Sequence, residues 1–322
     1  MTPDDPLLYL PSGVLENLDV SAQDVINATE KLFLGRAQGT VWNAPKTTIE
    51  PGDGRYFMNT LSVADDPPYA AIKALGLNPE NPSRGLEAIS GLVVLHDSVS
   101  GWPIAVIDGN WVTAIRTAGL TAVAAKYLAD PDSEVIAFIA CGVQGRSHLD
   151  VFAELYPLKE IRAFGRGSAN RDKLCEIAEN KGLKAIKSET AQSAIEGADI
   201  VITSVPHGLV KEPFLDARWL KPGAFAGIVD LAGPWIDDTM PTIERIIVDD
   251  LEQERTLPEP LVDPALVAGD ITQLCAGTVP GRQSADEITA FIFRGLAIGD
   301  LALAWLAYER ARAAGVGVEL ER

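Results

Sequence analysis

Residues 138–149, FIACGVQGRSHL, nearly spell the glycine fingerprint of a turn that binds the pyrophosphate of a dinucleotide. In this pattern Gly142 lets the backbone approach the phosphates, and Gly145 lets the following helix pack closely on the preceding strand. Ala140 stands where the first glycine belongs, which is tolerable if its φ is negative. The alternative is an ordinary tight turn without a ligand. An apolar strand before the turn and further strand–helix units after it favour dinucleotide binding.

The end of the next strand, AFGRGSANRDK, bears on which dinucleotide is bound. A site for NAD usually offers an Asp or Glu here to the ribose hydroxyls, and this segment has none before Asp172. It offers Arg166, Ser168 and Arg171, which suit a 2′-phosphate. A solvated polar loop is the alternative for each of these residues. We therefore predict NADP(H) as the cofactor, with NAD(H) as the alternative.

Three basic residues are candidates for binding an anion. Lys73 lies inside the otherwise apolar run AAIKALGL, and a lysine is rarely buried unless it is paired. It either reaches solvent from a sheet edge or points into a cleft where it meets an anion, and we favour the cleft. Arg116, on an alanine-rich helix, is either an exposed charge or a carboxylate clamp that uses the guanidinium fork. Lys46, in NAPKTTI, is a further candidate of the same kind.

Other chemistries find no support in the residue pattern. The histidines, His96, His148 and His207, have no metal-ligand spacing, so we predict no metal site and a structural or surface role for each. A G-x-S-x-G elbow is also absent, which argues against a serine hydrolase. Cys141 lies in the cofactor turn, where a nucleophilic role is improbable.

The elements that must position these residues fall into two groups. A helix capped by Ser21 is followed, from residue 40 to 107, by short β-type runs between Pro and Gly turns, as in a mostly antiparallel sheet. A long helix follows from residue 109. Strands and helices then alternate, which is typical of a parallel, doubly wound sheet. The expected strands are residues 134–140, 160–165, 198–205, 224–230 and 245–250, and a last helix is expected over about 285–314.

The fold class predicted is therefore α/β: a Rossmann-type doubly wound parallel sheet plus a discontinuous α+β domain for substrate binding and dimerisation. The discontinuous domain is expected to comprise residues 1–114 with 301–322. The dinucleotide-binding domain is expected to comprise residues 115–300. A chain of 322 residues has the length of two domains.

Composition narrows the partners and the compartment. A net charge of −18 disfavours nucleic acid and anionic membranes, although local cations still allow a small anionic substrate. Three widely spaced cysteines indicate neither a disulfide framework nor a zinc cluster and fit a reducing cytoplasm. The N-terminus lacks the features of a secretory signal. The apolar stretch GLAIGDLALAWLAY is interrupted by Asp300 and is too short to span a membrane. We expect a soluble cytoplasmic protein.

Several stretches, in order along the chain, resemble the ornithine cyclodeaminase/mu-crystallin family. They are YAAIKALGLNP, GLVVLHDSVSGWPIAVIDGNWVTAIRTAGLTAVAAKYLA, IACGVQGRSHLDVF, ADIVITSVPH, LKPGAFAGIVD and AGTVPGRQSADEITAF. The family includes ornithine and lysine cyclodeaminases, alanine and arginine dehydrogenases, and ketimine or pyrroline-2-carboxylate reductases. The resemblance implies a nicotinamide dinucleotide, an intermediate with an imine α to a carboxylate, and a homodimer.

Residue roles follow from the resemblance at matching positions. Lys73 and Arg116, with Lys46 as a further candidate, would hold the substrate carboxylate, and Lys73 would also assist proton transfer. The residues expected to contact the cofactor are Thr117, Gly142, Val143, Gln144, Gly145, Arg166, Ser168, Ser204, Val205 and Asp230.

Three departures from the family pattern bear on the substrate. Lys46 stands where the family often has Arg, so a forked contact is reduced to a point charge. Cyclodeaminases carry an acid where this chain has Ala232, with Asp230 two residues earlier. Phe293 replaces a serine that is common in the family. The last two changes alter the pocket expected near the nicotinamide.

The leading hypothesis is an NAD(P)H-dependent imine reductase or amino-acid dehydrogenase that transfers hydride between nicotinamide and the α-carbon of an imino or amino acid. Lys73 or Asp230 would be the catalytic acid. Two alternatives remain open. One is a cyclodeaminase that releases ammonia with catalytic NAD, which the missing acid at Ala232 disfavours. The other is a non-catalytic protein that binds NADPH or a small ligand, which the paired cations disfavour.

Overall fold

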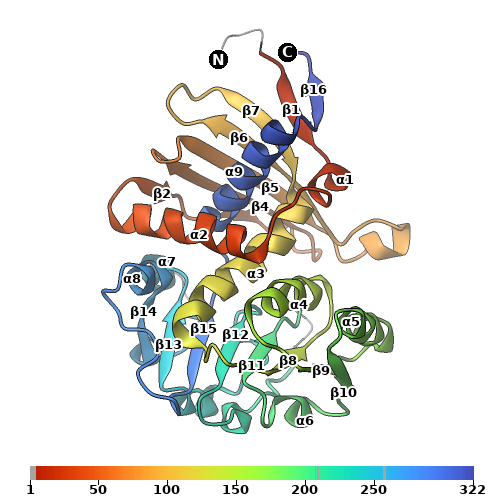
Figure 1. The fold of residues 1–322 in the computed structure, drawn as a ribbon, viewed down its shortest axis with the longest axis vertical. Coiled ribbons are helices and arrows are strands. Elements are labelled where there is room, and N and C mark those ends of the chain that lie inside the picture. Colours follow the sequence, from red (N-terminus) through yellow and green to blue (C-terminus); the bar gives the residue numbers. More distant parts are fainter. Residues whose placement is uncertain (1–4, 207, 209, 257–258) are drawn as a thin grey trace. The chain divides into compact units, whose positions relative to one another are not determined.

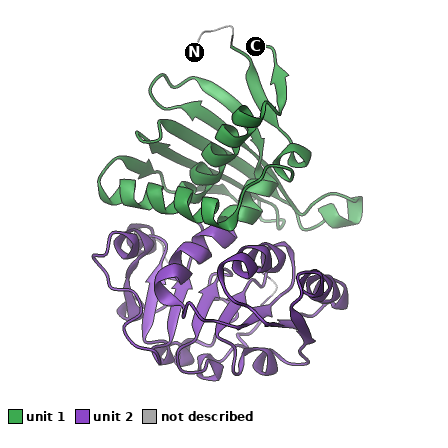
Figure 2. Cartoon of the chain, viewed as in Figure 1, with its two compact units in different colours: residues 1–116, 296–322 green, residues 117–295 purple. Residues whose placement is uncertain are grey.

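The computed structural model describes residues 5–206, 208, 210–256 and 259–322. The chain forms two compact units, residues 1–116 with 296–322 and residues 117–295 (Figure 2). The first unit is thus discontinuous in sequence. The first boundary falls within the helix α3 (Gly109–Leu128).

The first unit is built on one sheet. Its strand order is β16-β1-β7-β6-β5-β4-β2, with β3 paired to β4, and all neighbours are antiparallel except β1 and β7. The strands are β1 (Leu7–Leu10), β2 (Val41–Asn43), β3 (Thr47–Ile49), β4 (Tyr56–Ala64), β5 (Tyr69–Leu77), β6 (Ile89–Asp97), β7 (Pro103–Asp108) and β16 (Val318–Leu320).

Helices complete this unit. They are α1 (Ser12–Leu15), α2 (Ala22–Ala37) and α9 (Ala297–Ala314), and α9 packs against β4, β5, β6 and α2 (Figure 1). The predicted cap of α2 is confirmed, since Ser21 and Asp24 form a reciprocal capping box. Period-two burial along β4 places Met58, Thr60 and Ser62 on the buried face of the sheet.

The second unit holds eight parallel strands in the order β10-β9-β8-β11-β12-β15-β13-β14, which confirms the predicted doubly wound sheet. The strands are β8 (Val135–Ile139), β9 (Glu160–Phe164), β10 (Lys184–Lys187), β11 (Ile200–Thr203), β12 (Phe225–Ile228), β13 (Arg245–Val248), β14 (Val267–Asp270) and β15 (Thr289–Ile292). The chain runs outward from β8 to β10 and then returns to β11 on the other side of β8. This reversal of strand order is where doubly wound sheets bind their ligands.

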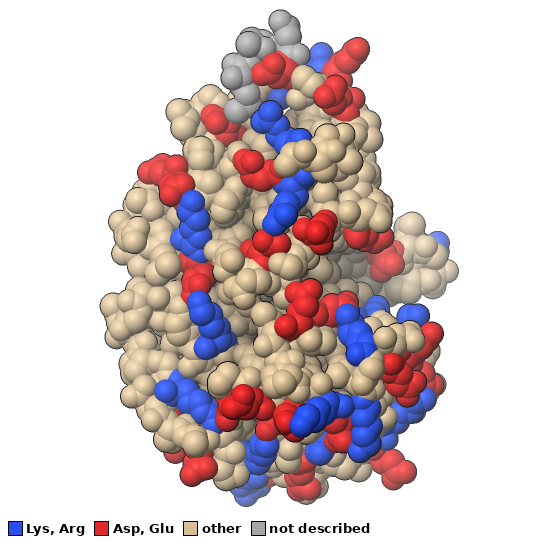
Figure 3. All heavy atoms as spheres, in the orientation of Figure 1, with Lys and Arg blue, Asp and Glu red and all other residues tan. Residues whose placement is uncertain are grey.

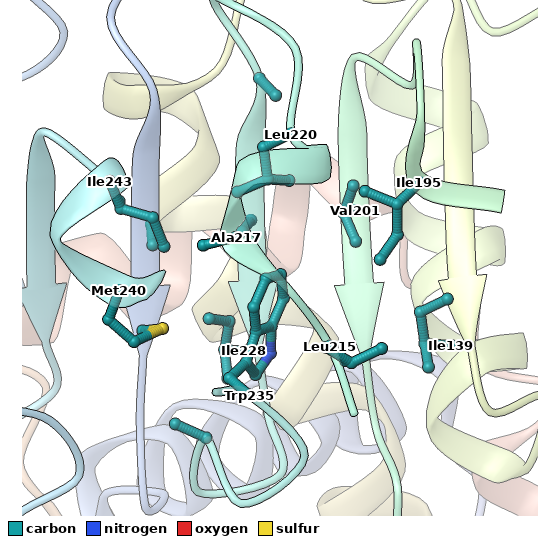
Figure 4. Packing of buried hydrophobic residues seen from close by; sticks show 14 of the residues in the cluster. Ile139, Ile195, Val201, Leu215, Ala217, Leu220, Ile228, Trp235, Met240 and Ile243 are labelled. Carbon is teal, nitrogen blue, oxygen red and sulfur yellow. The ribbon is translucent and has the colours of Figure 1, made fainter. Parts of the chain in front are cut away.

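Helices and short turns connect these strands. The helices are α4 (Val143–Leu155), α5 (Ser168–Asn180), α6 (Ala191–Ile195), α7 (Leu251–Thr256) and α8 (Ile271–Cys275). Among the described residues, 3₁₀ segments lie at Asn81–Arg84, Ala217–Trp219, Asp237–Thr242 and Pro264–Leu266, the first of them in the first unit. In the core on one face of the sheet, Trp235 packs with apolar side chains such as Leu215 and Ile228 (Figure 4).

The helix predicted over about 285–314 is wrong in its first part. Residues 289–292 form the buried strand β15, and α9 starts only at Ala297, after Gly295 with a φ of +90°. A short apolar run does not distinguish a buried parallel strand from a helix by its pattern alone. Pairing with β12 and β13 decided the outcome.

Charged side chains are spread over the face of the molecule drawn in Figure 3. In the view of Figure 3, acidic and basic side chains are interspersed rather than gathered into one basic patch. Within the described residues, no helix is long and apolar enough to cross a membrane.

Candidate functional site

A buried cluster of charges lies in the first unit. The Lys73 ammonium Nζ is 2.6 Å from Oδ1 of Asp300, and the Thr60 hydroxyl donates to Oδ2 of the same carboxylate at 2.9 Å. The Arg116 Nε lies 3.3 Å from Asp300 Oδ1. Lys73 and Asp300 are 1% and 2% exposed, so Lys73 does not reach solvent from a sheet edge, and its internal partner is a carboxylate.

Strand register and helix packing bring these residues together. Thr60 on β4 and Lys73 on β5 are direct cross-strand partners, so their side chains share one face of the sheet. That face is buried, and α9 packs on both strands. Asp300 lies in the first turn of α9, where the positive end of the helix dipole favours an anion.

Burial and charge act on the cluster in opposite directions. Burial, with a smaller effect from Arg116, lowers the pKa of Lys73 to about 8, although Asp300 favours its charged form. Burial also raises the pKa of Asp300, but Lys73 and Arg116 outweigh burial and hold it below its usual value. Two cations therefore face one carboxylate, which leaves one positive charge in excess. An anionic ligand such as a carboxylate would balance it.

Lys46, the third predicted cation, is half-buried between β2 and β3. It immediately precedes β3, which pairs with β4. Its part in carboxylate binding remains a prediction.

The glycine turn connects β8 to α4. Gly142 is the N-cap of α4, and a Cβ built at this position meets no atom within 4 Å. A Cβ at Gly145 would lie 3.0 Å from the Ala140 carbonyl oxygen, which confirms close packing of helix on strand. The turn is thus open where a pyrophosphate would approach and tight where the helix meets the strand, as the fingerprint requires.

Ala140 corrects one expectation, because its φ is +75° and not negative. The residue adopts the left-handed conformation that glycine would adopt without strain. Its N–H donates to the Phe164 carbonyl at 2.9 Å, so β9 holds the strained turn in place. Alanine therefore replaces the first glycine without changing the conformation of the turn.

Val143, Gln144 and Ser204, which are also predicted to contact the cofactor, lie in or next to this turn. Val143 is half exposed at the start of α4. The Gln144 Oε1 atom is buried and has no hydrogen-bond partner in the described part of the chain. Ser204, just after β11, has its hydroxyl 3.4 Å from the Ala140 carbonyl oxygen. The contact between Ser204 and Ala140 joins the carboxyl ends of β8 and β11.

Asp230 links the ends of β11 and β12. Its Oδ1 accepts a hydrogen bond from the Thr203 hydroxyl, and its Oδ2 accepts one from the Val205 N–H, both at 3.0 Å. Burial raises the pKa of Asp230 to about 7. Because both carboxylate oxygens are engaged, the side chain is anchored where the strands end, next to Val205. Of the two candidate acids, Asp230 belongs to the second unit and Lys73 to the first.

The two departures near the expected nicotinamide site have defined settings. Leu231 and Ala232 have φ values of +61° and +56°, a conformation that side chains rarely adopt. Ala232 is buried and offers no polar group. Phe293 follows β15, and its ring stacks on that of Phe291 with centroids 4.9 Å apart.

The segment after β9 carries the residues predicted to read the ribose. Arg166 and Ser168 are exposed, and Ser168 is the first residue of α5. Asp172, the first acid of the segment, pairs with Lys187 at 2.8 Å. The Arg146 guanidinium lies 3.3 Å from the Cys141 carbonyl oxygen and 3.4 Å from the Asn170 amide oxygen, so it adds a further cation next to the turn.

Two of these residues were missed from the sequence. Asp300 could have been noticed as the single charge in the apolar stretch GLAIGDLALAWLAY, but it was interpreted only as an interruption of a hydrophobic run. Arg146 gave no signal beyond its position after the turn. His207 lies outside the described residues. Among the described residues, no group of three or more His, Cys, Asp or Glu residues could hold a metal ion.

A doubly wound parallel sheet with a glycine turn at its switch point defines the second unit as a nucleotide-binding fold of the Rossmann type. The model of the ornithine cyclodeaminase/mu-crystallin family matches residues 8–315, and the chain belongs to this family. The resemblance seen in the sequence is thereby confirmed.

Three relatives match this chain over almost the whole length of both proteins. The alanine dehydrogenase of Archaeoglobus fulgidus is 30% identical over 98% of both chains. The structure of Thermococcus litoralis Δ1-pyrroline-2-carboxylate reductase with NADH and L-proline matches at 29% identity and a TM-score of 0.89, covering 97% of this chain and 99% of that one. An archaeal alanine dehydrogenase dimer with bound NAD matches at 29% identity and a TM-score of 0.88, covering 98% and 99%.

Proposed function

We propose that this protein is an NAD(P)H-dependent imine reductase or amino-acid dehydrogenase, in which hydride passes between nicotinamide and the α-carbon of an imino or amino acid. The observation that carries the proposal is the buried cluster of Lys73, Arg116 and Asp300, with its one excess positive charge. The names of the relatives support the same class of reaction.

The cluster would bind the substrate through its carboxylate. Asp300 offsets one of the two cations and holds Lys73 and the Arg116 Nε in place. A monocarboxylate would then bring the buried charge to zero, which a neutral ligand would not do. Fixing the carboxylate also fixes the orientation of the adjacent C=N or C–N bond, which reduces the entropic cost of reaction.

The glycine turn would hold the cofactor. The open space at Gly142, the N-terminus of α4 and the unpartnered Gln144 Oε1 fit a dinucleotide, the first two for its phosphates and the last for a hydroxyl donor. When bound, the nicotinamide supplies or accepts the hydride. Thr117, Ser204 and Val205 would complete the contacts by analogy with the family.

Lys73 is our choice for the proton donor. In the reductive direction the α-carbon gains a hydride and the imine nitrogen gains a proton, which together give the amine. A lysine with its pKa lowered to about 8 donates a proton near neutral pH more readily than an ordinary lysine. Asp230 is the second candidate. Its two engaged oxygens favour a role in holding Val205 near the cofactor path.

We further propose NADP(H) as the preferred cofactor. Arg166, Arg146 and Arg171 supply positive charge around the start of α5, and the nearest acid, Asp172, is paired with Lys187. A 2′-phosphate carries the negative charge that such a setting favours. An unmodified ribose would find no carboxylate for its hydroxyls between Phe164 and Arg171.

A homodimer formed by the first unit is also proposed. The sheet exposes a row of apolar side chains, namely Trp42, Ile49, Phe57, Leu61, Ile72 and Leu92. Leu61 and Ile72 are cross-strand partners, so the row is continuous across β4 and β5. An exposed apolar surface of this kind on a sheet usually packs against another protein. The dimeric archaeal relative favours a second copy of this chain. A cytoplasmic location stays a prediction.

The test is loss of NAD(P)H absorbance with purified protein. Pyrroline-2-carboxylate, piperideine-2-carboxylate, and pyruvate or glyoxylate with ammonia or methylamine would be the substrates, each with NADPH and NADH in parallel. Turnover would support the reductase, and the ratio of the two rates would test the cofactor preference. Tight cofactor binding without turnover would contradict the proposal. Ammonia release from ornithine or lysine would then identify a cyclodeaminase.

A further inference from the structure

A buried histidine joins the helix after the glycine turn to α3, within the second unit. His148 is 0% exposed, and its Nδ1 lies 2.7 Å from the Gln144 carbonyl oxygen. Its Nε2 lies 2.9 Å from the Thr121 hydroxyl, which is 3.1 Å from the Thr117 carbonyl oxygen. These contacts therefore connect Gln144, which the family resemblance assigns to the cofactor, to Thr121 on α3.

The chemistry of the partners defines the direction of these hydrogen bonds. A carbonyl oxygen only accepts, so the His148 Nδ1 carries the proton and donates to Gln144. The Nε2 atom is then an acceptor, and the Thr121 hydroxyl donates its single hydrogen to Nε2 rather than to the Thr117 carbonyl. Burial lowers the pKa of His148 to about 4, which keeps the ring neutral at neutral pH. Both bonds thus persist under ordinary conditions.

The bond to Gln144 acts on the part of α4 that matters for a dinucleotide. Gln144 is the second residue of the helix, in the first turn, whose N–H groups would face a pyrophosphate. The Oε1 atom of its side chain is buried and has no hydrogen-bond partner among the described residues. Holding the backbone of Gln144 therefore also limits where this acceptor can lie.

We propose that His148 is a positioning residue for the cofactor: it fixes the first turn of α4 through Gln144 and ties that turn to α3 through Thr121. The proposal rests on the proposed function, because it requires that the glycine turn bind a nicotinamide dinucleotide. A role in packing alone would need only the volume of the ring. Phe152 provides the comparison, since it is equally buried and stacks on His148 with centroids 6.1 Å apart, yet has no polar atom.

The experiment measures dissociation constants of NADPH and NADH by the fluorescence of the reduced nicotinamide. The proteins are the full-length wild type, His148→Leu, His148→Asn, Thr121→Val and Phe152→Leu, at a temperature where circular dichroism shows each one folded. Loss of one buried hydrogen bond typically weakens an interaction by about threefold to tenfold. We expect His148→Leu to raise Kd about tenfold and Thr121→Val about threefold.

Two comparisons separate positioning from packing. Phe152→Leu should lower the melting temperature as much as His148→Leu does and leave Kd within about twofold. In His148→Asn, the amide nitrogen can replace Nδ1 as donor to Gln144, so Kd should stay within about threefold of the wild type.

Equal Kd values for His148→Leu and Phe152→Leu would overturn the positioning role and leave the proposed function intact. An Asn variant that binds no better than the Leu variant would have the same consequence. If His148→Leu does not fold, the comparison of Thr121→Val with Phe152→Leu decides the question. In that case an unchanged Kd for Thr121→Val would overturn the proposal. A folded wild type that binds neither dinucleotide would overturn both the positioning role and the proposed function.

Discussion

The cation cluster of the first unit and the glycine turn of the second are built in opposite ways. In the cluster, Lys73, Arg116 and Thr60 all converge on the Asp300 carboxylate, within 3.3 Å. In the turn, the space beside Gly142 is open and the Gln144 Oε1 has no partner in the described chain. One site is assembled before any ligand arrives, and the other is shaped mainly by the absence of side chains.

The physical reason is the difference in the cost of desolvation. A buried charge without a partner costs several kcal/mol, so two buried cations need an internal carboxylate to be present in the folded protein. Backbone N–H groups at a helix N-terminus carry only partial charge. They can donate hydrogen bonds to water, which a phosphate then displaces. The first site should therefore be sensitive to charge, and the second to volume and backbone conformation.

Removing a cation should have the largest effect. We expect Arg116→Leu and Lys73→Met to lower kcat/KM on the order of 10³-fold, because each removes a charge that would bind and orient the substrate carboxylate. The Kd of NADPH, measured by fluorescence, should change less than about threefold in both variants. Cofactor binding lost in both would show that these residues do not have the substrate role.

Removing the anion should act first on the fold. Asp300→Asn leaves Lys73 and Arg116 without their counter-charge, and we expect a loss of about 3 kcal/mol in the free energy of unfolding, measured by urea titration. The double variant Lys73→Met with Asp300→Asn should recover part of this loss, because only one buried cation remains. Simple additivity of the two single variants would argue against charge coupling in the cluster.

The pH dependence of kcat/KM tests the protonation state of Lys73. Its charged form would bind the carboxylate and donate the proton, so activity should be level below a pKa of about 8 and fall about tenfold per pH unit above it. The same depressed pKa means that the unfolded chain binds more protons than the folded one between about 8 and 10.5. The cost to folding of burying Lys73 therefore falls across that range, so the free energy of unfolding rises with pH there. A profile that stays level to pH 10 would remove Lys73 from the proton transfer.

Two glycine substitutions should separate cofactor binding from folding. Gly142→Ala places a methyl group in open space, so stability should hold while the Kd of NADPH rises about tenfold through lost approach of the phosphates. Gly145→Ala brings its Cβ to 3.0 Å from a backbone oxygen, and should cost about 1–3 kcal/mol of stability. Equal affinities in the wild type and Gly142→Ala would show that the pyrophosphate does not lie at this turn.

The smallest effect is expected at Ala140. Replacing it with glycine relieves a left-handed φ and makes the unfolded chain more flexible, so we expect a net gain of about 0.5 kcal/mol. Ala137→Gly in the middle of β8 is the matched control and should destabilise by about 1 kcal/mol. Thermal melting of both variants provides the measurement. A loss of stability in Ala140→Gly would mean that the strain at this turn is negligible.

Much of this protein follows from its sequence. Alternating apolar strands and helices after residue 134 required a doubly wound sheet, because strands that are apolar along their whole length must be covered on both faces. The glycine turn and its open and tight positions follow from the lack of a Cβ at Gly142 and Gly145. The lysine in an apolar run allowed either a sheet edge or a cleft, of which we favoured the cleft, and the burial of Lys73 excludes the exposed edge.

Only the tertiary structure decided what Lys73 meets. Asp300 lies 227 residues further along the chain and reaches the lysine because α9 returns to pack on β4 and β5. No local pattern encodes that contact, and one acid in an apolar stretch of sequence looks the same whether it faces a cation or water. The conformation of Ala140 was decided in the same way, because a bond from its N–H to β9 holds a backbone angle that alanine alone disfavours. Sequence determines which groups need partners, and packing between distant elements determines which partners they find.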